Sequence, residues 1–448
     1  MLDGRKTTAQ DRAHPMSWKT VISLGCCLFV VVGAWTRVGA QRAGAFMGSA
    51  EDPAIGYSTS PTHNDVADLN VRLRDGNIQF AFEGRSGFLR SALEALQIPI
   101  DSQLLVFSRT SLQGKRISEQ NPRAIFFNDR VALGWVRDGD VIEVATHDES
   151  GGVVFYTLDQ HGGTTGDPLQ FKRAFVCLGC HVTVDTLGVP GLLMFSTTRP
   201  EPTQFSGVPR HIDQGNPLEQ RFGGWFVTGS TGVTTHMGND VTALDGRPSR
   251  ELASVEGLFD SDGYRALSSD VVAHLVLTHQ AGMTNLLTRA GWEARAVDPS
   301  LHAPSVATAE QQAAITAVMS GVAREVVDHL LFVDEAKLTD RVRGSSDFSK
   351  RFSASGPRDH RGRSLYELDL NRRLMTYPCS YLIYSPAFDA LPPLIKDPIY
   401  RRLWAVLSGQ EGDPRYRSAL SKADRQAVVE ILRDTKQDLP RYFQSAVR

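Results

Sequence analysis

Five consecutive residues, Cys177-Leu178-Gly179-Cys180-His181, bring two thiols and an imidazole together within one short stretch. Each thiol at this spacing can add to a vinyl group of a porphyrin, and the histidine that follows is then placed under the iron. The pattern C-x-x-C-H is the signature of covalent attachment of c-type haem. The sequence therefore predicts one covalent haem c, with two thioether links to the cysteines and His181 as an iron ligand.

Two other uses of paired cysteines, a zinc site and a redox disulfide, fit the sequence less well. A structural zinc ion needs four ligands, and the chain has no second C-x-x-C. A thioredoxin-like pair opens a helix after a strand, whereas residues 171–176, just before the motif, have a pattern more typical of a helix. We therefore expect haem attachment, with zinc and a disulfide as the alternatives.

Haem iron also needs a sixth ligand or an open site, and Met237 is the candidate that the sequence favours. It follows His181 by 56 residues (237 minus 181), which is within the span of a small haem module. A thioether opposite a histidine raises the reduction potential and suits electron transfer. His236, His211 and His279 are the alternatives, and an ordinary core position is the other interpretation of Met237.

The first forty residues are expected to direct export, and c-type haem is attached outside the cytoplasm. Four basic residues precede an uncharged, mostly apolar run at 21–35, and small residues follow before position 41. This is the pattern of a secretory signal peptide cleaved after Ala40. In the alternative, residues 20–36 would remain as a membrane anchor, although the apolar run is short for a bilayer span. The expected location is the periplasm or another extracytoplasmic compartment.

The remaining chain predicts an α+β fold that consists of a linker and three regions. Residues 41–65 are rich in small and polar residues, which is typical of a linker. Short apolar runs separated by Asp-Gly and Gly-Gly predict a strand-rich region at 66–165, with a helix near 87–96. Residues 166–245 form the haem segment, which we expect not to fold alone. Helical periodicity predicts a mostly α-helical region at 246–448.

Four helices are expected in the C-terminal region. Ser269 could cap a long helix that runs to about Ala296. Thr308 and Ser421 begin patterns that resemble capping boxes, in which a side chain and the residue three positions later satisfy each other's backbone. Residues 393–407 are expected to form another helix.

Composition excludes some partners and leaves the physiological redox partner open. The net charge of −2 argues against a nucleic-acid binder, which would carry a basic excess. Outside the export segment the chain has only three cysteines, so it is not a disulfide scaffold. Three hypotheses remain: an electron carrier, a haem enzyme with an open distal site acting on peroxide or a small oxyanion, and a regulatory haem module. The electron carrier is the one we favour.

Three segments, 171–181, 222–239 and 377–392, resemble parts of a group of large bacterial proteins with one haem that are described as cytochrome c domain-containing. The resemblance extends over most of the mature chain and implies haem binding and electron transfer. Dihaem peroxidases are similar in size and compartment, but they need two C-x-x-C-H motifs and this chain has one.

Three more residues are expected to hold the haem. In the compact cytochromes c, a proline carbonyl in a Gly-Pro-x-Leu stretch accepts the Nδ1 proton of the proximal histidine, and Pro190 lies in a similar stretch in which Val189 separates the glycine and the proline. Such a bond orients the imidazole ring. Arg221 and Trp225, within a segment rich in glycine and aromatic residues, could bond a haem propionate. A simple turn at Pro190 and a core position for Trp225 are the alternatives.

Overall fold

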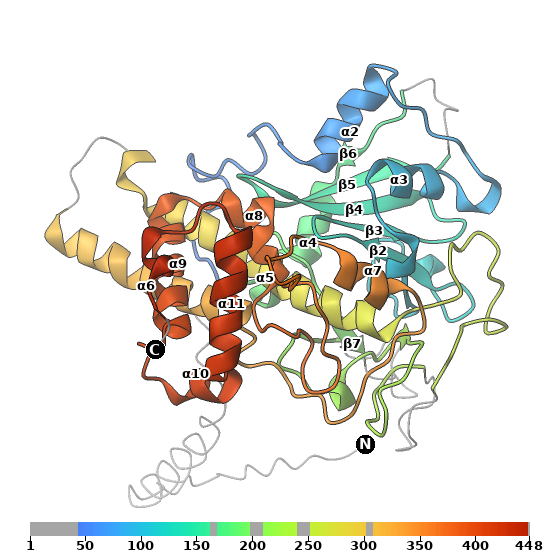
Figure 1. Ribbon diagram of the computed structural model, residues 1–448. Helices are drawn as coiled ribbons and strands as arrows, with labels where there is room; N and C mark the ends of the chain where they lie inside the picture. Colours follow the sequence, from blue (N-terminus) through green and yellow to red (C-terminus); the bar gives the residue numbers. More distant parts are fainter. Residues whose placement is uncertain (1–43, 162–167, 198–208, 240–250, 302–307, 447–448) are drawn as a thin grey trace, which may run out of the picture. The chain divides into compact units, whose positions relative to one another are not determined.

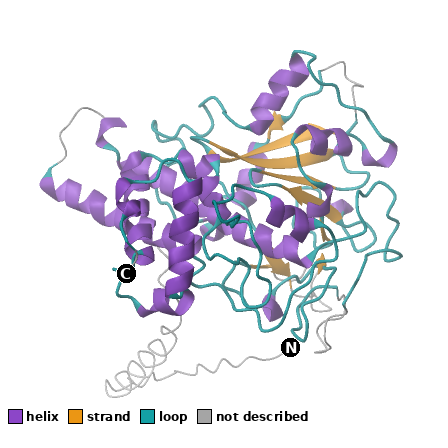
Figure 2. Cartoon of the chain, in the orientation of Figure 1, coloured by secondary structure: helices purple, strands orange, loops and turns teal. Residues whose placement is uncertain are grey.

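The computed structural model describes residues 44–161, 168–197, 209–239, 251–301 and 308–446. The expected export segment, 1–40, lies outside these residues. No helix in the described part of the chain is both long enough and apolar enough to cross a membrane. Strands dominate the N-terminal part and helices the C-terminal part (Figure 2), which confirms the α+β class.

A seven-stranded antiparallel sheet, in the order β6-β5-β4-β3-β2-β1-β9, forms the N-terminal part (Figure 1). Its strands β4 and β5 form the hairpin that the Gly-Gly pair predicts, and Gly152 at the turn has a φ of +75°, a left-handed conformation that glycine adopts without a steric penalty. The strands are β1 (Leu104–Val106), β2 (Arg123–Phe127), β3 (Val131–Trp135), β4 (Val141–Asp148), β5 (Gly152–Asp159), β6 (Lys172–Arg173) and β9 (Trp225–Phe226). A separate pair joins β7 (Phe195–Thr197) and β8 (Pro209–His211).

The two faces of the sheet carry side chains of very different size. Successive residues of a strand point to opposite faces, and β4 alternates between half-buried and buried positions along its whole length. One face buries large side chains such as Phe126 and Leu133 against two helices, α2 (Asp65–Arg74) and α3 (Leu89–Ala95). On the other face Ala132 pairs with Ala145, and Gly134 lies in the same strand. The partners of Gly134 and Ala145 in the neighbouring strands, Ile125 and Phe155, are large, so the room above this face is confined to the positions of the two alanines.

Helix α5 (Val271–Val297) contacts both the sheet and the C-terminal helices. Its N-cap is Asp270 rather than the expected Ser269, because the carboxylate of Asp270 accepts from the first backbone N–H groups of the helix. The predicted capping boxes at Thr308 and Ser421 and the predicted helix at 393–407 are confirmed. The other C-terminal helices are α6 (Ala309–Leu330), α7 (Phe348–Ala354), α8 (Pro386–Asp389), α9 (Pro393–Leu407), α10 (Pro414–Ala419) and α11 (Lys422–Thr435).

The described part of the expected linker, residues 44–64, packs into the core instead of running free. Phe46, Ile55 and Tyr57 are buried. The ring of Phe46 lies 5.4 Å from that of Trp292 on α5, and the hydroxyl of Tyr57 donates to the carbonyl of Val153 at 2.9 Å. A few apolar side chains thus fix a segment whose average composition is that of a linker.

The described part of residues 166–245, the expected haem segment, is built into the sheet. Its strand β6 pairs with β5, and its strand β9 pairs with β1, so it supplies both edge strands. Residues 171–176, expected to be helical, contain this strand and the start of a 3-10 turn, because Lys172 and Arg173 pair with Thr157 and Tyr156.

Candidate functional site

The cysteine motif lies on two short helical turns directly after β6. The first is a 3-10 turn, Phe175–Cys177, and the second is α4 (Leu178–His181). Cys177 is partly buried, Cys180 is exposed, and both thiols are free. Residues three apart in a helical turn lie on the same side, so both sulfurs border the same cavity, together with His181.

A strand before the motif also occurs in thioredoxin-like sites, so the fold removes one argument against a redox dithiol. The chemistry of the Cys177 thiol provides a different argument against a redox dithiol. Burial is the main cause that raises the pKa of Cys177, and the carboxylate of Glu143 adds to it. Reactive cysteines have a lowered pKa, because the thiolate is the nucleophile. Cys177 is therefore poorly suited to disulfide exchange.

His181 is oriented by its own backbone neighbourhood. Its Nδ1 lies 2.8 Å from the carbonyl oxygen of Gly191, and the N–H of Gly191 donates to the carbonyl of His181 at 3.0 Å. Burial lowers the pKa of His181, although the bond to Gly191 opposes this, which favours the neutral ring. A neutral ring that donates from Nδ1 keeps the lone pair of Nε2 for a metal. The acceptor is thus the carbonyl of Gly191 and not that of Pro190, which the sequence had led us to expect.

A cavity of about 580 Å³ opens beside the motif. This volume is within the range of ~300–1,000 Å³ that is usual for ligand and cofactor pockets. Its walls are the small-residue face of the sheet, residues 192–195, and α5 through Leu277 and Ala281. Ala132 and Ala145 carry only a methyl group, so a planar ring system can lie close to the strands there, whereas the side chain of Arg123 already covers Gly134. The residues present therefore fit a porphyrin.

The charged groups of the cavity differ from those expected. Arg109, Arg123 and Glu143 line it. Arg123 and Glu143 form an ion pair, and the buried Nε of Arg123 has no hydrogen-bond partner in the described structure. A guanidinium group binds carboxylates well, so these arginines can hold propionates.

Arg221 and Trp225 do not line this cavity, contrary to expectation. The guanidinium of Arg221 donates to the carbonyls of Gln214 at 2.8 Å and Asn216 at 2.7 Å. The indole of Trp225 donates to the carbonyl of Phe195 at 2.7 Å. Both side chains are buried and stabilise the loops behind the cavity.

Met237 is not brought to the cavity either. Its sulfur lies 3.7 Å from the hydroxyl of Ser196 in β7. Residues 192–195 line the cavity, whereas neither Ser196 nor Met237 does. The methionine that does line the cavity is Met194, which the sequence reasoning missed because it follows His181 by only 13 residues (194 minus 181).

The three histidines considered as alternative ligands also lie outside the cavity wall. His279 is fully buried, with Nδ1 2.6 Å from Gln214 and Nε2 2.7 Å from Ser380, so both ring nitrogens are engaged. His236 packs against Phe222, and its Nδ1 accepts from a backbone N–H at 3.0 Å. His211 pairs with Phe195 across β7 and β8, but His211 itself does not line the cavity.

The geometry of the motif does not favour a bound zinc ion. In the described parts of the chain, the one set of three potential ligands whose atoms lie within 4.8 Å of each other is Asp359, His360 and Asp434. The carboxylate of Asp359 is already engaged by Arg363, and His360 by Asp434. The two motif cysteines and His181 do not converge in this way, although a tetrahedral zinc ion would require it.

Comparisons with known proteins identified no relative of this chain. No protein-family model matches the chain. No curated protein and no solved structure is similar to it at a significant level. The site is therefore interpreted from its own residues and geometry.

Proposed function

We propose that this protein is an exported c-type cytochrome with one haem, which acts in electron transfer. The observation that carries the proposal is that both thiols and the imidazole of the C-x-x-C-H motif border one cavity of about 580 Å³. The proposed relatives are the large bacterial cytochrome c domain-containing proteins, and the proposed location is the periplasm. When bound, the haem supplies reversible one-electron chemistry.

Each residue of the cavity has a definite part in this proposal. Cys177 and Cys180 form the thioether links, and the Nε2 of His181 binds the iron. The bond from Nδ1 to Gly191 keeps the ring oriented and makes it a better ligand. Arg109 and Arg123 bond the propionates. We assign the sixth position to Met194, in place of Met237.

The surroundings of the motif support exchange of electrons with another protein. Phe175, Val176, Val182 and Val184 flank the motif and are exposed, with Val176 at 67% and Val184 at 78%. An apolar patch of this kind marks an interaction site. A redox partner docked there would lie close to the edge of the haem.

A haem enzyme that acts on peroxide or a small oxyanion is the second candidate. It is favoured by the Arg123–Glu143 pair, which places a cation and a carboxylate on the sheet side of the cavity. A guanidinium can hold an anionic substrate, and a carboxylate can move a proton. This candidate requires that no side chain occupies the sixth position.

Covalent attachment is tested on protein matured in a host that attaches c-type haem. We expect a peroxidase-active band on a denaturing gel, and a haem that acidified organic solvent does not extract. Cys177→Ala and Cys180→Ala should each leave at most one thioether, and the double variant should leave none. Cys379→Ala is the matched control, because this third cysteine is buried elsewhere in the core, and it should retain the haem. Extractable haem, or bound zinc in its place, would refute the proposal.

The spin state separates the two candidate functions. An electron carrier with a protein ligand at the sixth position should be low-spin in the ferric state and should bind carbon monoxide slowly or not at all. A high-spin ferric spectrum with rapid carbon monoxide binding would favour the enzyme.

A further inference from the structure

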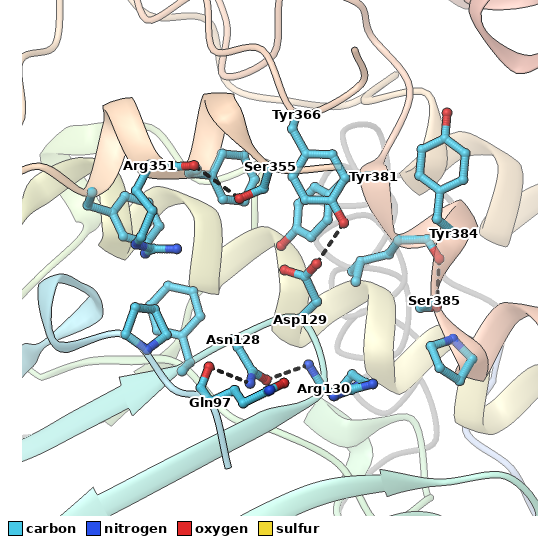
Figure 3. Close-up of a pocket in the computed structure, with 16 residues that line it drawn as sticks. Gln97, Asn128, Asp129, Arg130, Arg351, Ser355, Tyr366, Tyr381, Tyr384 and Ser385 are labelled. Atoms are coloured by element: carbon cyan, nitrogen blue, oxygen red, sulfur yellow. Dashed lines mark hydrogen bonds between the residues drawn. The ribbon is translucent and has the colours of Figure 1, made fainter. Parts of the chain in front are cut away.

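A second cavity, of about 480 Å³, lies between the β2–β3 loop and the C-terminal half of the protein (Figure 3). It shares no lining residue with the cavity beside the motif. Phe127, Asn128 and Asp129 line it from the sheet, and α7 contributes Phe348 and Arg351. The remaining wall comes from Tyr366 and residues 381–386.

The walls of this second cavity are rich in aromatic rings that contact one another. Phe127 and Phe348 have their ring centroids 5.7 Å apart, and Phe352 lies 5.2 Å from Tyr366. Tyr366 and Tyr381 are 4.9 Å apart. Aromatic pairs at such distances stabilise each other, and a planar apolar ligand would extend the same packing.

Each hydroxyl group that lines this cavity already donates a hydrogen bond to another group of the protein. Because the hydroxyl of Thr435 donates to Ile431 at 2.6 Å, Tyr384 is the donor in its bond with Thr435. The bonds are Tyr366 to Asp129 at 2.6 Å, Tyr381 to Gln280 at 2.9 Å, Tyr384 to Thr435 at 2.6 Å, Ser355 to the carbonyl of Arg351 at 3.0 Å, and Ser385 to the carbonyl of Leu382 at 2.6 Å. None of these hydroxyls needs an acceptor on a ligand.

Asp129 provides the acceptor that remains. Among the described residues, Tyr366 is the one hydrogen-bond partner of its carboxylate, and this bond uses Oδ2. Figure 3 shows the carboxylate beneath the hydroxyl of Tyr366. Burial raises the pKa of Asp129, because the partly buried carboxylate is less well solvated than it would be in water. A hydroxyl group on a ligand would compensate for this by donating to Oδ1.

The arginines at this cavity argue against a cationic ligand. Arg351 pairs with Asp101 at 2.7 Å, and Arg130 pairs with Asp65 at 3.1 Å. Each positive charge is thus already matched by a carboxylate outside the cavity wall. A cation that approached Asp129 would nevertheless be repelled by the guanidinium groups of Arg130 and Arg351, which line the cavity.

We propose that this second cavity binds a small neutral aromatic molecule that carries a hydroxyl group. The hydroxyl donates a hydrogen bond to Asp129, and the ring of the molecule packs among the aromatic side chains. This site is independent of the proposed haem chemistry, because its residues lie outside the motif cavity. The chemical class includes phenols and hydroquinones.

Calorimetry with hydroquinone tests the proposal on the full-length holoprotein. The protein is reduced beforehand and kept under anaerobic conditions, so that oxidation of the ligand contributes no heat. We expect saturable binding of one hydroquinone per chain. The matched probe is 1,4-dimethoxybenzene, which has the same ring and no donor, and it should bind at least about tenfold more weakly, since a hydrogen bond to a charged group is lost. Equal binding of the two probes, or no saturable binding of hydroquinone, would overturn the proposal.

Two variants locate the bound molecule. Asp129→Asn keeps an oxygen for Tyr366 and turns an amide donor toward the cavity, so hydroquinone affinity should fall about tenfold or more. Ser355→Phe introduces a ring at the partly exposed end of α7, and it should block binding without replacing a core residue. Asp434→Asn, on the exposed side of α11, is the control and should bind hydroquinone as the wild type does. Unchanged affinity in both cavity variants would show that hydroquinone binds elsewhere and would refute the site.

Discussion

At the scale of single residues, the bond between His181 and Gly191 decides which atom can bind a metal. The Nδ1 of His181 is 2.8 Å from a carbonyl oxygen, which can only accept, so Nδ1 carries the proton. Nε2 is then left with its lone pair, and His181 lines the cavity. Met194 lines the same cavity, and its thioether is the kind of soft ligand that ferrous iron favours.

The first residue-scale prediction compares Met194 with Met237. Met194→Ala should remove the weak far-red sulfur-to-iron band of the ferric protein and lower the reduction potential, because the thioether ligand raises it. Met237→Ala is the matched control, since Met237 does not line the cavity and its sulfur contacts Ser196 instead. Optical spectra and redox titrations check both variants. If Met237→Ala abolishes the band and Met194→Ala does not, Met237 is the ligand.

At the scale of elements, one carboxylate positions the helix that forms a wall of the cavity beside the motif. The Oδ1 of Asp270 accepts from the backbone of Val272 and Ala273 at the start of α5. Its Oδ2 accepts from the backbone of Ser345 and Ser346 at 2.8 Å, and from the hydroxyl of Ser346 at 2.7 Å. Asp270 is fully buried, so its loss would leave five donors without water to replace it.

The stability of the protein should therefore depend strongly on Asp270. Asp270→Ala should lower the free energy of unfolding by at least about 3 kcal/mol, since a lost cap and several buried unsatisfied donors add up. Thr308→Ala removes the cap of α6 at an exposed position and should cost only about 1 kcal/mol. Urea unfolding followed by circular dichroism measures both. Similar costs for the two caps would show that the buried network of Asp270 contributes little.

At the scale of the whole molecule, the segment that carries the C-x-x-C-H motif and the sheet depend on each other. The segment contributes edge strands on both sides of the sheet, while the sheet contributes Arg123, Glu143 and the small residues of the cavity wall. Helix α5 and residues 44–64 complete the packing through Trp292. The residues that line the cavity are spread from Arg109 to Ala281, so no short fragment of the chain contains the whole site.

A fragment that spans residues 170–240 should fail to fold and should not hold haem in a defined environment. Its strands β6 and β9 would lack the partners β5 and β1, and the cavity would lack its floor. Circular dichroism and the haem spectrum of the fragment, measured beside those of the full chain, test this. A stably folded fragment with a native-like spectrum would contradict it.

The sequence by itself determined the features that depend on local spacing. The C-x-x-C-H motif, the capping boxes at Thr308 and Ser421 and the β4–β5 hairpin all follow from residues a few positions apart, where backbone geometry leaves few choices. Tertiary structure alone decided which distant residues share the cavity. Arg123 and Met194 line it while Arg221 and Met237 do not, because the pairing of distant strands and the packing of the loops between them select these residues, and local spacing encodes neither.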